Sequence, residues 1–255
     1  MTMSRRVMLG MLGAVGAVSS PPKGRAAESV LALDEILARH TQALGSEAAL
    51  GRVRGKRVDL QIIEKGSVVE ARYGADKSPA FRIDIYDKGR HVFCEGLDAR
   101  GPWIWPGGAP AAKQGVPEAK ASGLTGIQFN LYGLKQFPAL GHRIAVDGRE
   151  EIEGVNYHVL RVTLKDAYDT YLYLDPATFL IARRRDFRPN HPDLNPTKER
   201  LETQFSDYRR VGGIMNAFLQ HQVELATDKI NQVQVVERME YDPEGAVKDR
   251  SVKEA

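Results

Sequence analysis

The histidines and the cysteine are the side chains of this chain best suited to metal binding or nucleophilic catalysis. There are six histidines and one cysteine, and the histidines fit no metal-ligand spacing. The sequence also contains no nucleophile elbow, no paired-cysteine motif and no phosphate-binding glycine loop. The segment Asn190-His191-Pro192-Asp193 offers two ligands, but the prolines in and around it and the lack of a third ligand nearby favour a solvated loop. We therefore expect no metal, no cofactor and no catalytic residue.

The single cysteine, Cys94, follows His91 by three residues. On a regular strand this spacing places the two side chains on opposite faces, which disfavours a cysteine–histidine catalytic pair. We interpret Cys94 as a small apolar strand residue. With only one thiol, the chain can form no internal disulfide.

Two tryptophans, Trp103 and Trp105, lie two residues apart between proline and glycine residues. On a strand they share one face. Two interpretations stay open, since such a pair either packs in the core or forms the aromatic rim of an apolar pocket.

Residues 206–218 combine polar side chains with a Gly-Gly pair, which raises the question of a site. Gly212 and Gly213 supply the backbone freedom of a tight reversal between two strands. We interpret the segment as a turn of the sheet, with Asp207 or Tyr208 hydrogen-bonding to that turn.

The elements that must position these residues follow from hydrophobic periodicity. Helical spacing predicts a helix that Ser29 caps and Gly45 ends, a short helical turn at residues 46–50, and a glycine-containing helical segment over residues 117–140. Residues 109–117 are interpreted as a loop. The period is two elsewhere, which predicts a mainly β (α+β) fold of about ten or eleven antiparallel strands. These strands form a curved sheet or incomplete β-barrel, with an N-terminal helix and a helical lid.

The inner face of such a sheet must pack against the helical segments or a ligand. The helix within residues 117–140 therefore either plugs the core or covers a gated apolar cavity. For the cavity, the candidate ligand-binding residues are the apolar strand positions, the two tryptophans at the rim and the apolar side of the helical segment: Val58, Leu60, Ile62, Phe81, Ile83, Ile85, Trp103, Trp105, Leu124, Ile127, Leu131 and Leu134.

Residues 1–26 have the layout of an export signal, with Arg5-Arg6 followed by an apolar run and a small-residue exit. The paired arginine resembles a twin-arginine (Tat) signal, and a Sec signal that contains two arginines by chance is the alternative. The apolar run is shorter than the roughly 20 residues that span a bilayer, so we expect no membrane span after its removal. We expect one domain over residues 27–242 and a charged, disordered tail at residues 243–255.

Charge offers no indication of a nucleic-acid partner. The chain has 36 basic and 33 acidic residues, and four of the basic residues lie in residues 1–26. Without that segment the chain has 32 basic and 33 acidic residues, which gives a net charge of −1.

Two blocks of the sequence resemble the LolA-like group of bacterial lipoprotein-sorting proteins. The first runs from Ile36 to Val53. The second comprises Tyr171 to Arg183, Ser206-Asp207-Tyr208-Arg209 and Val211-Gly212-Gly213-Ile214. With the order of elements, the resemblance covers most of residues 29–242. It implies an incomplete β-barrel with a helical lid over a cavity for acyl chains. In the carrier itself an inward arginine latches the lid, and the candidates here are Arg57, Arg72, Arg82 and Arg161.

These observations predict a non-catalytic periplasmic carrier or binding protein for a lipid or acylated ligand, with lipoprotein trafficking to the outer membrane as one such role. An envelope sensor that recognises a protein partner is the first alternative. A periplasmic hydrolase is the second.

Overall fold

The computed structural model describes residues 30–165, 168–189 and 195–247. The expected export signal at residues 1–26, the expected cap Ser29 and the segment Asn190-His191-Pro192-Asp193 lie outside the described residues. So does most of the expected tail.

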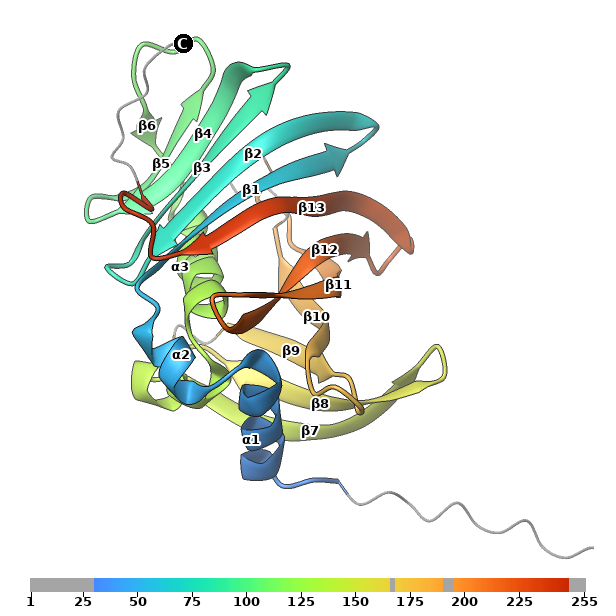
Figure 1. Ribbon diagram of the computed structural model, residues 1–255. Coiled ribbons are helices and arrows are strands. Elements are labelled where there is room, and N and C mark those ends of the chain that lie inside the picture. Colours follow the sequence, from blue (N-terminus) through green and yellow to red (C-terminus); the bar gives the residue numbers. More distant parts are fainter. Residues whose placement is uncertain (1–29, 166–167, 190–194, 248–255) are drawn as a thin grey trace, which may run out of the picture.

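The described residues form one antiparallel sheet of thirteen strands that curves around a concave face (Figure 1). Alternation of apolar and polar residues along most strands gives one face to the interior and one to solvent. The fold class is as predicted, with more strands than the expected ten or eleven. The strands are β1 Gly55–Glu64, β2 Ser67–Asp76, β3 Ala80–Asp87, β4 Arg90–Asp98, β5 Gly101–Pro106, β6 Lys113–Gln114, β7 Arg143–Ile152, β8 Val155–Thr163, β9 Asp169–Leu174, β10 Ile181–Arg188, β11 Glu199–Val211, β12 Ile214–Glu224 and β13 Lys229–Tyr241.

The strand order explains why the sheet needs a helical crossing. The order is β6-β5-β4-β3-β2-β1-β13-β12-β11-β10-β9-β8-β7, so β1 to β6 proceed outward to one edge of the sheet. The chain then passes to the opposite edge, where β7 begins and the remaining strands return to pair β13 with β1. Helix α3 (Pro117–Leu131) lies in this crossing, on the concave side of the sheet (Figure 1).

The helices match the sequence predictions with shifted boundaries. Helix α1 (Leu33–Leu44) follows Ala32 and ends at Gly45. Helix α2 (Glu47–Arg52) begins after Ser46, whose side chain accepts a hydrogen bond from the Ala49 backbone N–H.

The predicted helical segment over residues 117–140 is not one helix. Helix α3 ends at Leu131, and two short 3₁₀ helices follow, η1 (Leu134–Gln136) and η2 (Pro138–Leu140). Pro138 lacks a backbone N–H, and Gly141 adopts the left-handed conformation at φ 86°, so the chain turns away there. The loop predicted at residues 109–117 contains the short strand β6, which pairs with Trp103 and Ile104.

The Gly-Gly segment is a turn, as predicted. Gly212 and Gly213 have φ values of 55° and 86°, the positive values of a two-residue hairpin turn between β11 and β12. The expected turn contacts were wrong, because Arg210 donates to the Gly213 carbonyl at 2.8 Å while the Tyr208 hydroxyl donates to the Ile181 carbonyl at 2.6 Å. Asp207 forms an ion pair with Arg209.

The predicted separation of His91 and Cys94 was also wrong. Ile85 pairs with Phe93 and Tyr86 with His91, so Val92 is an extra residue on β4. Such a bulge shifts the alternation by one residue. His91 and Cys94 therefore reach the same side of the sheet, beside Asp84, and the ligand atoms of the three residues lie within 4.8 Å of one another.

Candidate functional site

A cavity of about 370 Å³ lies on the concave face, between the central strands and α3. Its walls come from β1, β2, β3, β9 to β13, α1, α3 and the segment after α3. Most lining side chains are apolar, and none of those in the described part of the chain is Asp or Glu. A mostly apolar concavity with a few polar groups is the usual form of a small-ligand site.

Five of the twelve candidate residues line this cavity. They are Val58, Leu60, Ile62, Ile83 and Leu134. The first three occupy alternate positions of β1, which explains their common face.

Other candidates lie nearby but outside the cavity wall. Phe81 and Trp103 border a smaller neighbouring pocket of about 190 Å³. Ile127 and Leu131 are buried where α3 packs on the sheet, and Leu124 is partly buried against the same cluster. Ile85 packs with the cluster around Val58.

The tryptophans pack in the core. Trp103 and Trp105 are each 2% exposed and form a buried cluster with Cys94. The Trp105 indole N–H donates to the Ala109 carbonyl at 2.6 Å. In the strand register, Trp105 pairs with Cys94 while Ile83 pairs with Glu95, so Trp105 faces away from the cavity side.

Two glycines of α3 have different surroundings. A Cβ on Gly123 would come within 2.3 Å of the Phe81 ring, so α3 approaches the sheet closely only because that residue has no side chain. A Cβ on Gly126 would meet nothing within 4 Å, and Gly126 lines the cavity. The helix is therefore fixed at one glycine and leaves open space at the other.

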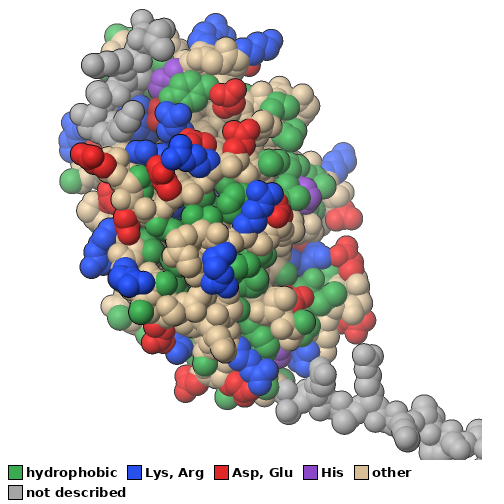
Figure 2. Space-filling model, in the orientation of Figure 1, with side chains coloured by type: hydrophobic (Ala, Val, Ile, Leu, Met, Phe, Trp, Pro, Cys, Tyr) green, Lys and Arg blue, Asp and Glu red, His purple; other side chains and the backbone are tan. Residues whose placement is uncertain are grey.

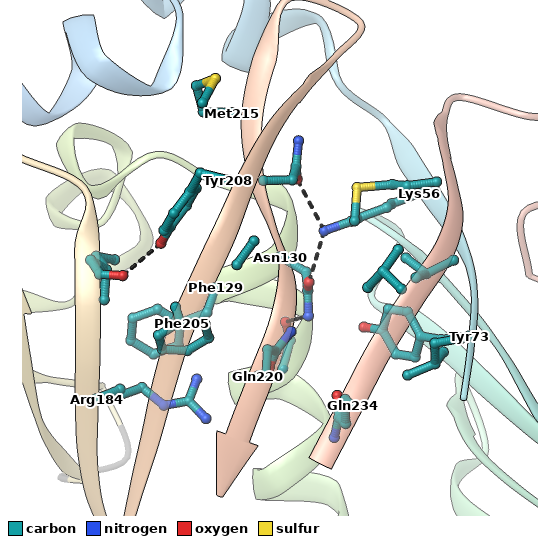
Figure 3. Close-up of a pocket in the computed structure, with 18 of the residues that line it drawn as sticks. Lys56, Tyr73, Phe129, Asn130, Arg184, Phe205, Tyr208, Met215, Gln220 and Gln234 are labelled. Atoms are coloured by element: carbon teal, nitrogen blue, oxygen red, sulfur yellow. Dashed lines mark hydrogen bonds between the residues drawn. The ribbon is translucent and has the colours of Figure 1, made fainter. Parts of the chain in front are cut away.

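The polar end of the cavity is built around Lys56, which sequence reasoning missed. Lys56 is 6% exposed, and its Nζ donates to Asn130 Oδ1 at 3.1 Å and to Asn216 Oδ1 at 3.4 Å (Figure 3). No carboxylate pairs with it among the described residues. Burial lowers the pKa of Lys56 to about 8, because the charged form is poorly solvated there.

The neighbours of Lys56 are neutral groups held in place by other hydrogen bonds. The Asn130 amide N–H donates to the Gly126 carbonyl at 2.9 Å, which leaves its oxygen for Lys56. The Asn216 amide N–H donates to the Ile214 carbonyl at 2.9 Å, and its oxygen accepts from the Tyr241 hydroxyl at 2.7 Å. The Tyr241 ring lies 5.9 Å from Lys56 Nζ. Amide oxygens and a π face partly compensate a cation but do not neutralise it.

Tyr73 adds a second polar group at this end of the cavity. Its hydroxyl is buried and makes no hydrogen bond of regular geometry in the described structure. Burial raises the pKa of Tyr73, and Asn130 opposes that rise. Lys56, Asn130 and Tyr73 project toward the same space in Figure 3.

Arg184 on β10 is the arginine of the cavity wall (Figure 3). Its Nε donates to Asp186 Oδ2 at 2.8 Å, and its guanidinium lies 5.4 Å from the Phe129 ring of α3. Arg184 therefore has an acid beside it within the same strand, and it shares that acid with Arg188, whose Nε lies 3.6 Å from the same Oδ2.

The four arginines considered from sequence lie outside the cavity wall. Arg57, Arg72 and Arg161 form ion pairs with Glu240, Asp59 and Asp169 respectively. Arg82 forms a bidentate pair with Asp84 at 2.8 and 2.6 Å. The sequence could not single out one of these arginines as the lid latch, because all four lie on strands with the same alternating pattern.

The cluster around Asp84 is a second polar site on the other side of the sheet. His91 Nε2 lies 3.0 Å from Asp84 Oδ1, and the His91 ring lies between Tyr86 and Trp105 at 4.9 and 4.8 Å. Aspartate, histidine and cysteine are zinc ligands. However, burial raises the pKa of the Cys94 thiol, and Arg82 already neutralises Asp84. The arrangement is that of an internally compensated ion-pair cluster.

On the face shown in Figure 2, basic and acidic side chains are interspersed. Among the described residues, no helix has the length and apolar character needed to cross a membrane.

Comparison with known proteins shows the fold. No protein-family model and no curated protein matches the sequence. A putative outer membrane lipoprotein-sorting protein domain from Vibrio parahaemolyticus is similar in structure, with a TM-score of 0.54 at 12% identity over 82% of this chain and 91% of that chain. A LolA superfamily protein from Nitrosomonas europaea gives a TM-score of 0.55 at 10% identity over 86% of this chain and 99% of that chain. The chain therefore has a LolA-like fold.

Proposed function

We propose that this chain is a non-catalytic periplasmic binding protein that holds an acyl chain of a lipid or lipoprotein in the cavity on its concave face. The observation that supports this most strongly is the apolar cavity of about 370 Å³ beneath α3. The LolA-like fold, shared with a structure described as a lipoprotein-sorting domain, is consistent with it. Residues 1–26 would direct export, and carriage of lipoproteins to the outer membrane is the specific role proposed.

The binding energy would come from apolar burial. Each buried methylene contributes about 0.8 kcal/mol, so about ten methylenes supply about 8 kcal/mol before the ordering costs of the chain. Val58, Leu60 and Ile62 offer a continuous apolar surface along β1 for this contact.

Helix α3 would act as the lid. It has no side-chain cap at its N-terminus, and Gly123 and Gly126 lower its intrinsic helix stability. A cover with modest local stability can open without unfolding the sheet.

The test is native mass spectrometry, with organic extraction, of protein purified from the periplasm without detergent. We expect a co-purifying acyl species in the wild type and in Gly126→Ala. We expect none in Gly126→Trp, because the indole would occupy the open space beside Gly126. Gly126→Ala is the matched control, since it adds a methyl group at the same helical position.

Two results would contradict the proposal. One is a ligand-free wild-type mass with no uptake of added lipid. The other is equal acyl loading of Gly126→Trp and Gly126→Ala, which would place the ligand elsewhere. In the first case a co-purifying protein partner would favour the envelope-sensor alternative.

A further inference from the structure

We propose that the cavity selects a single-chain anionic amphiphile, a fatty-acid anion, whose carboxylate pairs with Lys56. This inference rests on the proposed acyl-binding function and names its ligand class. The LolA-like fold does not require it, because it depends on side chains particular to this cavity.

The first step is the charge of the cavity wall. Lys56 and Arg184 both line the cavity, and the lining residues described include no acid. Arg184 is paired with Asp186, an acid that it shares with Arg188, whereas among the described residues Lys56 contacts only amide oxygens and an aromatic ring. A buried cation without a counter-ion is unfavourable, so an anion that enters the cavity gains more at Lys56 than at Arg184.

The second step is the supply of hydrogen-bond donors. A lysine ammonium has three N–H donors, and Asn130 and Asn216 accept from two of them. The third has no protein acceptor in the described part of the chain. The buried Tyr73 hydroxyl also lacks a hydrogen bond of regular geometry and borders the same cavity. One ammonium donor and one hydroxyl donor suit the two oxygens of a carboxylate.

The third step is the direction of the acyl tail. Val58, Leu60 and Ile62 follow Lys56 at alternate positions of β1 and line the same cavity. Lys56 and Ile62 are about 20 Å apart along a strand that rises about 3.3 Å per residue. A tail anchored at Lys56 can therefore run along an apolar strand face.

The fourth step is the choice of anion. One unmatched lysine carries one positive charge, which equals the charge of a carboxylate. A phosphate monoester carries about −1.5 to −2 near neutral pH and would keep uncompensated charge in the apolar cavity. The observations therefore favour a carboxylate over a phosphate head group.

The experiment measures binding of three twelve-carbon probes by isothermal titration calorimetry at pH 7, with delipidated full chain. The probes are laurate, methyl laurate and dodecyl phosphate. In the wild type we expect laurate to bind about 10- to 100-fold more tightly than methyl laurate, as for a hydrogen bond to a charged group. Dodecyl phosphate should bind more weakly than laurate.

The matched variants are Lys56→Met and Tyr73→Phe. Lys56→Met removes the charge and keeps an unbranched side chain one atom shorter. It should reduce laurate affinity to that of methyl laurate, with the affinity for methyl laurate unchanged. Tyr73→Phe should reduce laurate affinity about 3- to 10-fold through loss of one hydrogen bond. It also keeps the test decisive if Lys56→Met does not fold.

The outcomes separate this inference from the proposed function. If the wild type binds laurate and methyl laurate equally, acyl binding stands and the carboxylate assignment is overturned. A preference for dodecyl phosphate overturns it as well. If none of the three probes binds, the proposed function itself fails.

Discussion

Lys56 and Arg82 are two buried cations on nearby strands, and they differ in the groups that surround their charges. The Arg82 side chain is 8% exposed and makes a bidentate pair with Asp84, which also lies 3.0 Å from His91. Lys56 is as deeply buried but contacts only neutral acceptors in the described structure. The difference indicates that Arg82 is part of the scaffold, whereas Lys56 carries the charge that the proposed ligand would match.

The pKa values follow the same division. Burial acts to lower the pKa of Arg82, but the hydrogen bonds and charge of Asp84 outweigh that effect and raise the pKa overall. Lys56 has no such partner in the part of the chain that the structure describes, and burial lowers its pKa to about 8. Folding therefore stabilises the charged form of Arg82 and destabilises the charged form of Lys56.

The largest expected effect is at the compensated pair. Asp84→Ala leaves the Arg82 guanidinium buried without its partner, and we expect a loss of about 3–5 kcal/mol in the free energy of unfolding. Urea denaturation monitored by tryptophan fluorescence measures it. The control is Asp59→Ala, which breaks the more exposed pair with Arg72 and should cost no more than about 1 kcal/mol. Equal losses in the two variants would remove the distinction between scaffold and surface pairs.

The next effect is a pH dependence at Lys56. Because its folded pKa is lowered, the unfolded chain binds more protons between pH 8 and about 10.5, so stability rises with pH in that window. Relative to Lys56→Met, the free energy of unfolding of the wild type should rise by about 2 kcal/mol between pH 7 and 9.5. Urea denaturation at each pH gives the difference.

The difference between the wild type and Lys56→Met separates the titration of Lys56 from that of the groups around it. Burial raises the pKa of Tyr73 and raises that of Tyr241 to about 12, so both stay neutral in the folded protein over this range. Burial also raises the pKa of Cys94. Its contribution to stability therefore falls as pH rises, equally in the wild type and the variant. A wild-type minus variant difference that is flat from pH 7 to 9.5 would falsify the description of Lys56 as an unmatched buried charge.

The smallest effect concerns packing on the two sides of α3. Gly123→Ala places a methyl group against Phe81 and should cost about 1–2 kcal/mol in the free energy of unfolding. Gly126→Ala places the same methyl group in open space and should stabilise the helix by at most about 1 kcal/mol. Thermal unfolding of the two variants measures both. If both glycines tolerate alanine equally, the sheet side of α3 is not more tightly packed than the cavity side.

Local patterns predicted many elements well, because turns and alternation depend on neighbouring residues. The Gly212-Gly213 reversal and the short helix after Ser46 were confirmed on that basis. Strand β6 was missed since two residues carry no periodic signal, and only its pairing with Trp103 and Ile104 defines it as a strand. The Val92 bulge was missed because it appears only in the pairing of β4 with β3. The sequence analysis therefore also missed that His91, Cys94 and Asp84 lie together.

The candidate site was predicted only in part. Val58, Leu60 and Ile62 line the cavity because strand alternation determines their common face. Lys56 is in phase with them, so a charged residue at the start of an apolar face was the signal that could have identified it. The tryptophans left two interpretations open, and only the register of β4 and β5 places Trp105 away from the cavity.

The sequence by itself determined that Lys56 shares a face with an apolar strand surface, since the period of a strand follows from covalent geometry. Only the tertiary structure decided that no acid of the described residues pairs with it. Asn130 comes from α3, Asn216 from β12 and Tyr241 from β13, and they surround Lys56 because β13 closes against β1 while α3 crosses the concave face. Whether a buried charge is matched depends on which distant segments pack around it, and that packing is a property of the whole fold.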